Sequence, residues 1–396
     1  MSNEIVIVSA VRTAVGRFGG SLKDINSGEL GATVIKEAIQ RAGISPEQVD
    51  EVILGEVRQS TESSNVARVA ALRAGVPETA PAFTVNRLCA SGMQAITSGV
   101  QQIISNQADI VVAGGTESMS KAPIYLRNSR FGEGNPTIVD SNVENGQQPQ
   151  EIFGSHLGMG ITAENVAERY QISREDQDAF AVLSQQKAAK AIENERFKDE
   201  IIPVQVKERK NSFLFDTDEH PRPKTTVEKL AQLKPAFRQN GTVTAGNACG
   251  RNDGSAAVVL MTAEKAKSLG VKPLARIVDW STAGVSPEVM GVGPVPALEK
   301  LLKKTGKSIE EVGLIELNEA FASQALAVIR EAKLDIDKVN VNGGAIALGH
   351  PLGATGCKIV TSLIYEMLKR DEKYGVATLC VGGGQGMAIM IEQLQS

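Results

Sequence analysis

The sequence repeats itself, with considerable divergence, in two halves. When the chain is shifted by 263 residues, AGISPEQV at residues 42–49 aligns with TGKSIEEV at residues 305–312, and Glu56 pairs with Glu319. In both copies a helix-like apolar pattern precedes the glycine and an apolar strand follows the valine. The sequence therefore predicts two diverged halves rich in βαβ units, and chance similarity between two α/β segments is the alternative.

Each half also contains an apolar strand that runs into glycines, at residues 110–115 (IVVAGG) and 377–384 (ATLCVGGG). These runs are continuous rather than alternating, which is typical of strands covered by helices on both faces of a sheet. A helix is expected at residues 92–105, with its apolar side chains on one face. The glycine runs lie 268 residues apart, so the loops are expected to differ between the copies.

Composition excludes several classes of protein. The 396 residues include 42 Lys and Arg against 46 Asp and Glu, a net charge of −4, which argues against a dedicated nucleic-acid binder. The longest apolar runs are too short to span a bilayer, and no secretion signal opens the chain. Four cysteines without a CxxC pair favour neither a disulfide scaffold nor a zinc site. We expect a cytoplasmic globular enzyme without a metal.

The motif NRLCASG at residues 86–92 places Cys89 between a predicted strand and the first turn of a helix. Unpaired N–H groups and the helix dipole favour a thiolate there and lower the pKa of a cysteine. The alternative is an inert cysteine that packs the corner between the strand and the helix.

His350 lies in the glycine-rich motif NGGAIALGHPLGATG at residues 342–356, also just before a predicted helix. Two halves related by a pseudo-twofold axis would bring equivalent junctions together, so Cys89 and His350 become a candidate nucleophile and its base. Cys380 ends a strand before GGGQG at residues 382–386, where an active-site loop is expected.

The segment between the halves has a different character. Residues 128–150 have a loop-like composition, and helices are expected at residues 163–170 and 174–197. Residues 203–238 carry a net charge of +3, which predicts either a solvated face or contact with an anionic ligand. The basic residues there are Lys207, Arg209, Lys210, Arg222, Lys224, Lys229, Lys234 and Arg238.

Taken together, these blocks resemble the thiolases, the group of acetyl-CoA acetyltransferases and 3-ketoacyl-CoA thiolases. Four blocks carry the resemblance in order: the Cys89 motif, NEAF at residues 318–321, the His350 motif and CVGGG at residues 380–384. The resemblance implies duplicated βαβαβαββ halves that form a layered α-β-α-β-α core. It also implies an N-terminal half at residues 1–120 and 246–270, an inserted CoA-binding loop domain at 121–245 and a C-terminal half at 271–396.

The resemblance implies a two-step acyl transfer, the reversible condensation of two acetyl-CoA molecules to acetoacetyl-CoA and CoA. Cys89 would carry the acyl group after His350 removes its proton, and Cys380 would exchange a proton with the second acetyl-CoA. His350 and a water held by Asn318 would stabilise the enolate, and the N–H groups of Cys89 and Gly382 would stabilise the tetrahedral intermediate. No metal or prosthetic group is implied, and CoA serves as substrate and product.

CoA contacts are implied for a further set of residues in the loop domain and at the inner end of its channel: Met159, Arg222, Phe237, Ala245, Cys249, Ala320 and Phe321. Two positions depart from the family pattern. Many members have a serine where Cys249 stands in this chain. In acetoacetyl-type members a histidine precedes the methionine that corresponds to Met159, and Gly158 stands in its place here. His156 could still reach the acyl pocket, or Gly158 could open room for a longer chain.

Several alternatives remain open at this point. The chain could be a degradative thiolase for longer 3-ketoacyl chains, a 3-ketoacyl or hydroxymethylglutaryl-CoA synthase, or a non-catalytic acyl-CoA or lipid carrier. A dinucleotide oxidoreductase would rest on the glycines alone. The family is dimeric or tetrameric, and an apolar strand at a sheet edge would allow pairing of two copies, so a homodimer or homotetramer is expected.

Overall fold

The computed structural model describes residues 4–132, 134–208 and 211–394. Arg209 and Lys210 of the basic segment, like the outermost residues of the two predicted halves, lie outside these ranges. Within them, no helix combines the length and the apolar character needed to cross a bilayer.

The first half contributes five strands to one large sheet, in the order β4-β3-β5-β11-β1. The strand β3 runs parallel to β4 and to β5, whereas β11 is antiparallel to β5 and to β1. The bounds are β1 Ile5–Thr13, β3 Glu51–Gly55, β4 Ala82–Val85, β5 Ile110–Ser118 and β11 Asn252–Thr262. The short strands β2 (Gly16–Arg17) and β8 (Ile201–Ile202) pair with β11 and β1.

The second half repeats this arrangement, in the order β13-β14-β15-β12. Here β13 is parallel to β14, and β15 is antiparallel to β14 and β12. A single parallel bridge between Ile315 and Val339 stands where the first half has β4. The bounds are β12 Ala275–Gly284, β13 Leu314–Leu317, β14 Tyr374–Val381 and β15 Gln385–Gln393. Two residue pairs between β1 and β12 join the half-sheets.

The duplication expected from the sequence is thus confirmed, with one correction. The strand registers pair Leu54 with Gly114 in the first half and Leu317 with Thr378 in the second. Gly114 is therefore equivalent to Thr378 and not to Gly382, as the alignment of glycine runs predicted. The glycine runs differ in place because Gly114 lies within β5, whereas Gly382 follows the end of β14.

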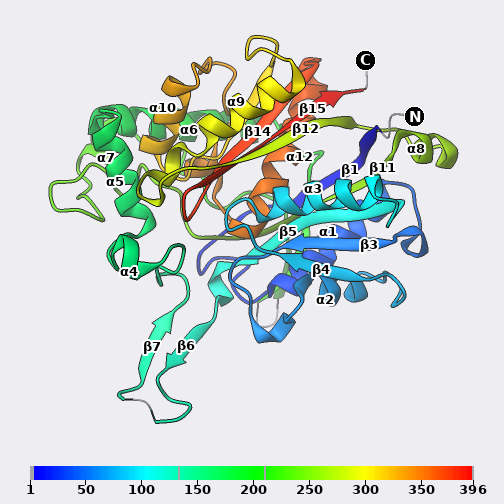
Figure 1. The fold of residues 1–396 in the computed structure, drawn as a ribbon, viewed down its shortest axis with the longest axis horizontal. Coiled ribbons are helices and arrows are strands. Elements are labelled where there is room, and N and C mark those ends of the chain that lie inside the picture. The colour runs from blue at the N-terminus through cyan, green and yellow to red at the C-terminus, as the bar shows by residue number, and fades with distance from the viewer. Residues whose placement is uncertain (1–3, 133, 209–210, 395–396) are drawn as a thin grey trace.

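Helices form three layers around the two half-sheets, which gives the expected α-β-α-β-α core (Figure 1). The central layer is α3 (Ser91–Ile104) and α12 (Leu352–Arg370), and their apolar side chains share one core with inward-facing residues of both half-sheets. The outer layers pack in two separate clusters. They comprise α1 Ser27–Arg41, α2 Val66–Arg73 and α8 Ala263–Leu269 on one side, and α9 Pro294–Thr305 and α10 Ala322–Glu331 on the other.

The segment between β5 and β11 adds helices and hairpins at the edge of this core. The helices expected at residues 163–170 and 174–197 are α5 (Met159–Arg169) and α6 (Arg174–Glu193), and the Ser173 side chain caps α6. The other elements of this segment are α4 Gln150–Phe153, α7 Val227–Ala231, the hairpin β9 Val204–Glu208 with β10 Asn211–Phe215, and the short turn η3 Met119–Lys121. The short turn η4 Pro287–Val292 lies between β12 and α9. A four-residue helix, α11 Ala345–Leu348, precedes α12, and the turns η1 Pro46–Gln48 and η2 Thr61–Ser63 flank β3.

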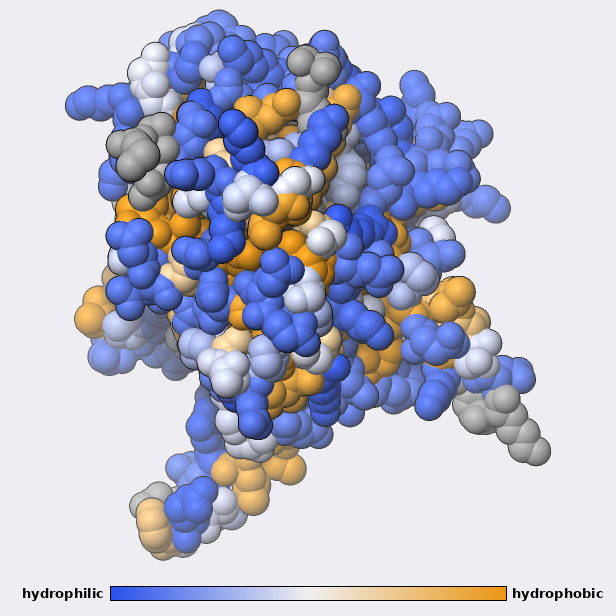
Figure 2. Space-filling view, turned by 90° about the vertical axis from the view of Figure 1, so that its right-hand side faces the viewer, coloured by the Kyte–Doolittle hydropathy of each residue, from blue (hydrophilic) through white to orange (hydrophobic). Residues whose placement is uncertain are grey.

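A second hairpin corrects the expectation of loop at residues 128–150. The strand β6 (Ile124–Arg127) pairs with β7 (Thr137–Asp140), because β-branched and aliphatic residues interrupt the Gly- and Asn-rich composition. This hairpin projects from the body as an arm with apolar side chains on its surface (Figures 1 and 2). Ile124, Leu126, Phe131 and Ile138 are each more than half exposed.

Candidate active site

Cys89 lies on a tight turn between β4 and α3, two residues before the helix begins. The turn is closed by Asn86, whose side chain accepts from the Leu88 N–H at 2.9 Å, and by Ser91, whose hydroxyl donates to the Leu88 carbonyl at 2.7 Å. Leu88 has a φ of 45°, a strained conformation for a leucine. The turn therefore holds the Cys89 thiol in one place, where the backbone N–H groups of Gly382 and of Cys89 itself donate to the sulfur.

His350 occupies the equivalent place in the second half, two residues before α12. Its backbone N–H donates to Asn252 Oδ1 at 2.9 Å. The ring Nδ1 lies 2.7 Å from Thr355 Oγ1, and the Thr355 hydroxyl donates to the Pro351 carbonyl at 2.8 Å. Because that hydroxyl hydrogen is already used, Thr355 accepts the proton of Nδ1, and the lone pair of the neutral ring is at Nε2.

Two glycines allow the helix ends that carry Cys89 and His350 to meet. A Cβ at Gly92, the second residue of α3, would lie 2.8 Å from the carbonyl oxygen of Gly353, the second residue of α12, and 2.9 Å from the backbone nitrogen of Cys357. Any side chain at Gly92 would force the helices apart. The structure thus brings together the two junctions that the repeat predicted to be equivalent.

The charge state of this pair differs from the sequence-based expectation. Burial raises the pKa of Cys89, and the N–H groups of Gly382 and Cys89 and the charge of Arg58 only partly oppose it. The expected lowering of this pKa was therefore wrong, because desolvation outweighs the helix end. Burial, aided by the Lys358 ammonium, lowers the pKa of His350 to about 3. The resting pair is a neutral thiol and a neutral imidazole.

Cys380 is completely buried at the end of β14. It packs in a cluster with residues that line the cavity in front of Cys89: Met159, Ala248, Met290, Ala320 and Phe321. Burial raises the pKa of Cys380 well above its ordinary value, and the nearby Cys89 and Cys249 raise it further. The structure therefore groups three thiols at one end of the cavity.

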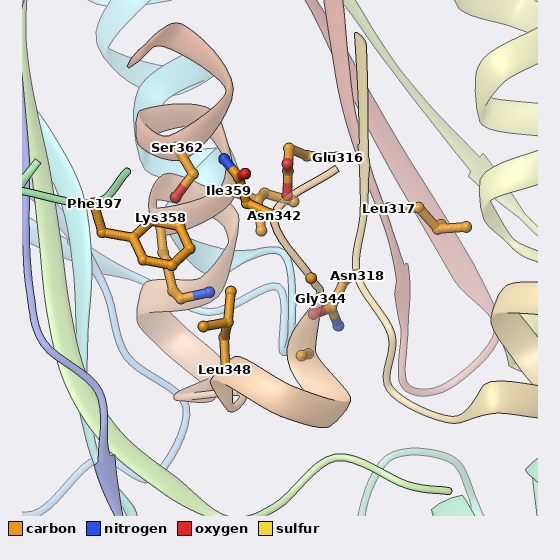
Figure 3. A pocket seen from close by; sticks show the side chains of 12 residues that line it. Phe197, Glu316, Leu317, Asn318, Asn342, Gly344, Leu348, Lys358, Ile359 and Ser362 are labelled. Carbon is orange, nitrogen blue, oxygen red and sulfur yellow. The ribbon is translucent and has the colours of Figure 1, made fainter. Parts of the chain in front are cut away.

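Asn318 lies directly after β13, and its Nδ2 is 3.5 Å from His350 Nε2. Its Oδ1 is buried and, within the described part of the chain, has no hydrogen-bond partner. Behind it lies a cavity of about 10 Å³, room for about one water molecule, towards which Lys358 projects from α12 (Figure 3). Asn318 can thus hold a small polar group beside the His350 ring.

The cavity in front of Cys89 has a volume of about 470 Å³, the size of a site for a small organic ligand. Its wall includes Cys89 and His350. Five of the residues expected to contact CoA also line it: Met159, Phe237, Cys249, Ala320 and Phe321. Phe237 and Phe321 meet edge to face, with ring centroids 6.3 Å apart.

Two other expected CoA contacts, Arg222 and Ala245, are exposed and do not form part of this wall. Arg222 lies beside His220, whose ring covers Gly250, and Gly250 is on the wall. Arg222 is therefore close to the rim of the cavity. The Cys249 N–H donates to the Ala320 carbonyl at 3.0 Å, and burial raises the pKa of the Cys249 thiol to about 12.

The space beside Gly158 is filled and not open. A Cβ at Gly158 would lie 2.9 Å from Asn145 Oδ1, so the Asn145 amide occupies the volume that a side chain at 158 would take. The expectation that Gly158 by itself opens room for a longer chain was therefore wrong. Asn145 and His156 both line the cavity, and the His156 ring packs on Gly154.

Sequence reasoning missed several residues of the site. Four residues that line the cavity were not predicted: Arg58, Asn145, Gln147 and Arg251. Thr355, which fixes the tautomer of His350, was not predicted either. Most of these residues lie in loops without a periodic pattern. The signal that could have found Thr355 is its place in the first turn of the helix that follows His350.

Comparison with known proteins gives one consistent family. The family described as "Thiolase, N-terminal domain" matches residues 5–264, and "Thiolase, C-terminal domain" matches residues 271–393. An acetyl-CoA acetyltransferase of Syntrophomonas wolfei is 52% identical over 402 residues and covers 100% of both chains. One of Pseudomonas aeruginosa is 54% identical over 391 residues, which cover 98% of this chain and 99% of the relative.

Solved structures agree with these matches. The Bacillus anthracis acetyl-CoA acetyltransferase superposes with a TM-score of 0.96 at 51% identity, over 99% of both chains. The human mitochondrial 3-ketoacyl-CoA thiolase in complex with CoA superposes with a TM-score of 0.94 at 44% identity, over 99% of this chain and 98% of that one.

Proposed function

The chain belongs to the thiolase family of acyltransferases, and we propose that it is an acetyl-CoA C-acetyltransferase. It condenses two acetyl-CoA molecules to acetoacetyl-CoA and CoA, and it catalyses the reverse thiolysis. The observation that carries this proposal is the placement of Cys89 and a neutral His350 on one cavity, with Cys380 buried behind its wall. The names of the most similar relatives support it.

In the first step, His350 Nε2 takes the proton of Cys89 as the sulfur attacks the thioester carbonyl of acetyl-CoA. The new S–C bond makes acetyl-Cys89, and the bond to the CoA sulfur breaks, after which CoA takes the proton from His350. The N–H groups that donate to the Cys89 sulfur, those of Gly382 and Cys89, lie where the carbonyl oxygen of the intermediate would develop its charge.

In the second step, Cys380 first releases its thiol proton to solvent, and the resulting thiolate removes a proton from the methyl carbon of a second acetyl-CoA. The carbanion attacks acetyl-Cys89, so that a C–C bond forms and the bond to Cys89 breaks, and the departing Cys89 thiolate takes up a proton from solvent to complete the cycle. A raised pKa makes the Cys380 thiolate a strong base for this proton. Asn318 and His350 lie together where they could stabilise the enolate oxygen.

The proposal includes CoA binding in the 470 Å³ cavity, with Phe237 and Cys249 along the pantetheine and Arg222 near the nucleotide end. Side chains and backbone groups of the chain carry every step, so we propose no metal or prosthetic group. We also propose a cytoplasmic homodimer or homotetramer. The edge strand β4, whose outer side pairs with no other described strand, and the apolar β6–β7 arm support association of copies.

The test combines turnover with labelling. Thiolysis of acetoacetyl-CoA by CoA is assayed without a malonyl donor, and the protein is incubated with radiolabelled acetyl-CoA. We expect label on Cys89, loss of label and turnover in Cys89→Ala, and retained label without condensation in Cys380→Ala. Cys357→Ala, a buried cysteine on α12 outside the site, is the matched control and should retain both. If Cys89 carries no label, a non-catalytic acyl-CoA or lipid carrier is favoured. If Cys89 is labelled but thiolysis is absent, a 3-ketoacyl or hydroxymethylglutaryl-CoA synthase is favoured.

A degradative 3-ketoacyl-CoA thiolase is the second candidate. The human mitochondrial 3-ketoacyl-CoA thiolase is 45% identical to this chain and superposes with a TM-score of 0.95, nearly as well as the acetyltransferase. Values of kcat/KM for 3-ketoacyl-CoA substrates of increasing chain length separate the two. A maximum at acetoacetyl-CoA supports the acetyltransferase, whereas a maximum at a longer chain supports the degradative enzyme.

A further inference from the structure

We propose that Glu117 is a positioning residue for this reaction: its buried carboxylate ties the loop after β3 to the first turn of α12 and so holds His350 in place beside Cys89. The inference rests on the proposed function, because it concerns the pair that would transfer the acyl group. Glu117 itself does not line the cavity.

Three backbone N–H groups donate to the Glu117 carboxylate. Oε2 accepts from Val57 at 3.0 Å and from Gly353 at 2.8 Å, and Oε1 accepts from Arg58 at 2.9 Å. Glu117 is 0% exposed, so each bond lies in a medium where its loss is costly. One side chain from β5 therefore joins two separate segments, one from each half of the duplicated chain.

The bond to Gly353 acts on the first turn of α12, three residues after His350. The N–H groups at a helix start have no partner within the helix, and a carboxylate is favoured there by the helix dipole. Gly353 has little freedom on its other sides, since a Cβ there would lie 2.7 Å from the Thr116 carbonyl oxygen and 2.8 Å from the Glu56 Cα. Glu117 thus fixes the helix start at its point of contact with the sheet.

The same helix start also contacts α3. The Gly353 carbonyl is the group closest to Gly92, so a shift of Gly353 changes the separation between the two helix ends. On its other side Glu117 holds the backbone of Arg58, whose side chain lines the cavity and whose charge acts on Cys89. Displacements of about 1 Å at reacting groups can reduce rates by about 100-fold.

A second carboxyl group, Glu56, lies beside Glu117 and takes no part in the proposed mechanism. It is 2% exposed, its Oε2 has no hydrogen-bond partner in the described ranges, and the Ser27 hydroxyl contacts it. Burial and the negative charge of Glu117 raise the pKa of Glu56 to about 8. At neutral pH Glu56 is therefore protonated. Burial raises the pKa of Glu117 as well, but the three donated N–H groups and the charge of Arg58 oppose that rise and favour the ionised form of Glu117 over that of Glu56.

Glu117→Gln and Glu117→Asp separate the two contributions of this side chain. The amide of Gln has a single acceptor oxygen and turns an NH₂ towards N–H donors, whereas Asp retains the charge but is one methylene too short. We expect kcat for acetoacetyl-CoA thiolysis to fall about 10- to 100-fold in both variants, with KM within about 2-fold. Glu56→Gln, the matched control, keeps the shape of the protonated acid and should retain kcat within about 2-fold at pH 7.

A second readout does not depend on turnover. The rate of Cys89 alkylation by iodoacetamide is measured against pH, because the Glu117 charge raises the pKa of Cys89. Glu117→Gln should move this profile to lower pH, and Glu117→Asp should leave it in place.

Wild-type-like kcat in Glu117→Asp, or in a folded Glu117→Gln, would overturn the proposal. If Glu117→Gln fails to fold, Glu117→Asp decides alone. If the wild-type protein itself has no thiolysis activity, the proposed function fails instead, and the alkylation profiles still report whether Glu117 acts on Cys89.

Discussion

Gly92 of α3 and Gly353 of α12 are in contact, and this contact lets the two halves of a duplicated chain share one site. Each glycine is the second residue of its helix, and each helix is preceded by a residue of the proposed pair, Cys89 or His350. The pseudo-symmetry of the fold thus places a nucleophile and a base at equivalent positions that have diverged in residue type.

Gly92→Ala should separate this pair. The new methyl group would lie within 3 Å of the Gly353 carbonyl oxygen and the Cys357 nitrogen, both backbone atoms that cannot turn away. We expect kcat/KM to fall about 100-fold or more, together with a lower melting temperature. Gly146→Ala, which meets nothing within 4 Å, is the matched control. Wild-type activity in Gly92→Ala would show that the contact is dispensable.

Thr355→Val should affect the tautomer of His350. Valine has nearly the same shape as threonine but cannot accept the proton of Nδ1, which lies 2.7 Å from the present hydroxyl. The ring then loses its fixed orientation, and we expect kcat to fall about 10-fold or more. Thr355→Ser retains the acceptor and should restore most of the activity. If kcat falls equally in Thr355→Val and Thr355→Ser, the loss reflects altered packing and not the loss of the hydrogen-bond acceptor.

The pH profile should lack the acid limb of an ordinary histidine. Because burial lowers the pKa of His350 to about 3, the imidazole is neutral and able to accept a proton at every pH well above that value. Acyl transfer to Cys89 should therefore not decline with a midpoint near 6.5 as the pH is lowered. Pre-steady-state formation of acetyl-Cys89 between pH 5 and pH 8 measures this. A midpoint near 6.5 that disappears in His350→Gln would contradict the assignment.

Asn145→Ala should widen the acyl end of the cavity. In the wild type the Asn145 amide fills the space beside Gly158, and alanine would remove that amide together with its 3.5 Å hydrogen bond to the Ser155 carbonyl. We expect kcat/KM for a six- or eight-carbon 3-ketoacyl-CoA to rise several-fold relative to acetoacetyl-CoA. The double variant Asn145→Ala, Gly158→Ala refills part of the space and should reverse the change. An unaltered ratio would place the acyl chain elsewhere.

The sequence alone was sufficient to predict the architecture and that Cys89 and His350 come together on one cavity. The repeat placed Cys89 and His350 at equivalent junctions, and the strand before the glycines placed Cys380, because these features are local and periodic. The pKa of Cys89 was predicted with the wrong sign, since the sequence shows the helix end but not the depth of burial. Asn145 was missed because it lies in a loop without a periodic pattern, and Glu117 because its contacts join segments that are distant in the chain.

The buried carboxyl pair makes stability depend on pH in a defined direction. The pKa of Glu56 is about 8 in the folded chain, against an ordinary value of 4.5. Between these values the folded protein retains a proton that the unfolded chain has lost, so this group's contribution is complete below pH 4.5 and declines until about pH 8.

Glu56→Gln has no such proton. Its free energy of unfolding, measured by urea denaturation, should therefore increase relative to wild type by about 5 kcal/mol from pH 4.5 to pH 8 and then level off. Below pH 4.5 both side chains are neutral and the difference should be constant, which provides the internal control. A difference that stays flat across the whole range would mean that Glu56 is ionised in the folded protein at neutral pH.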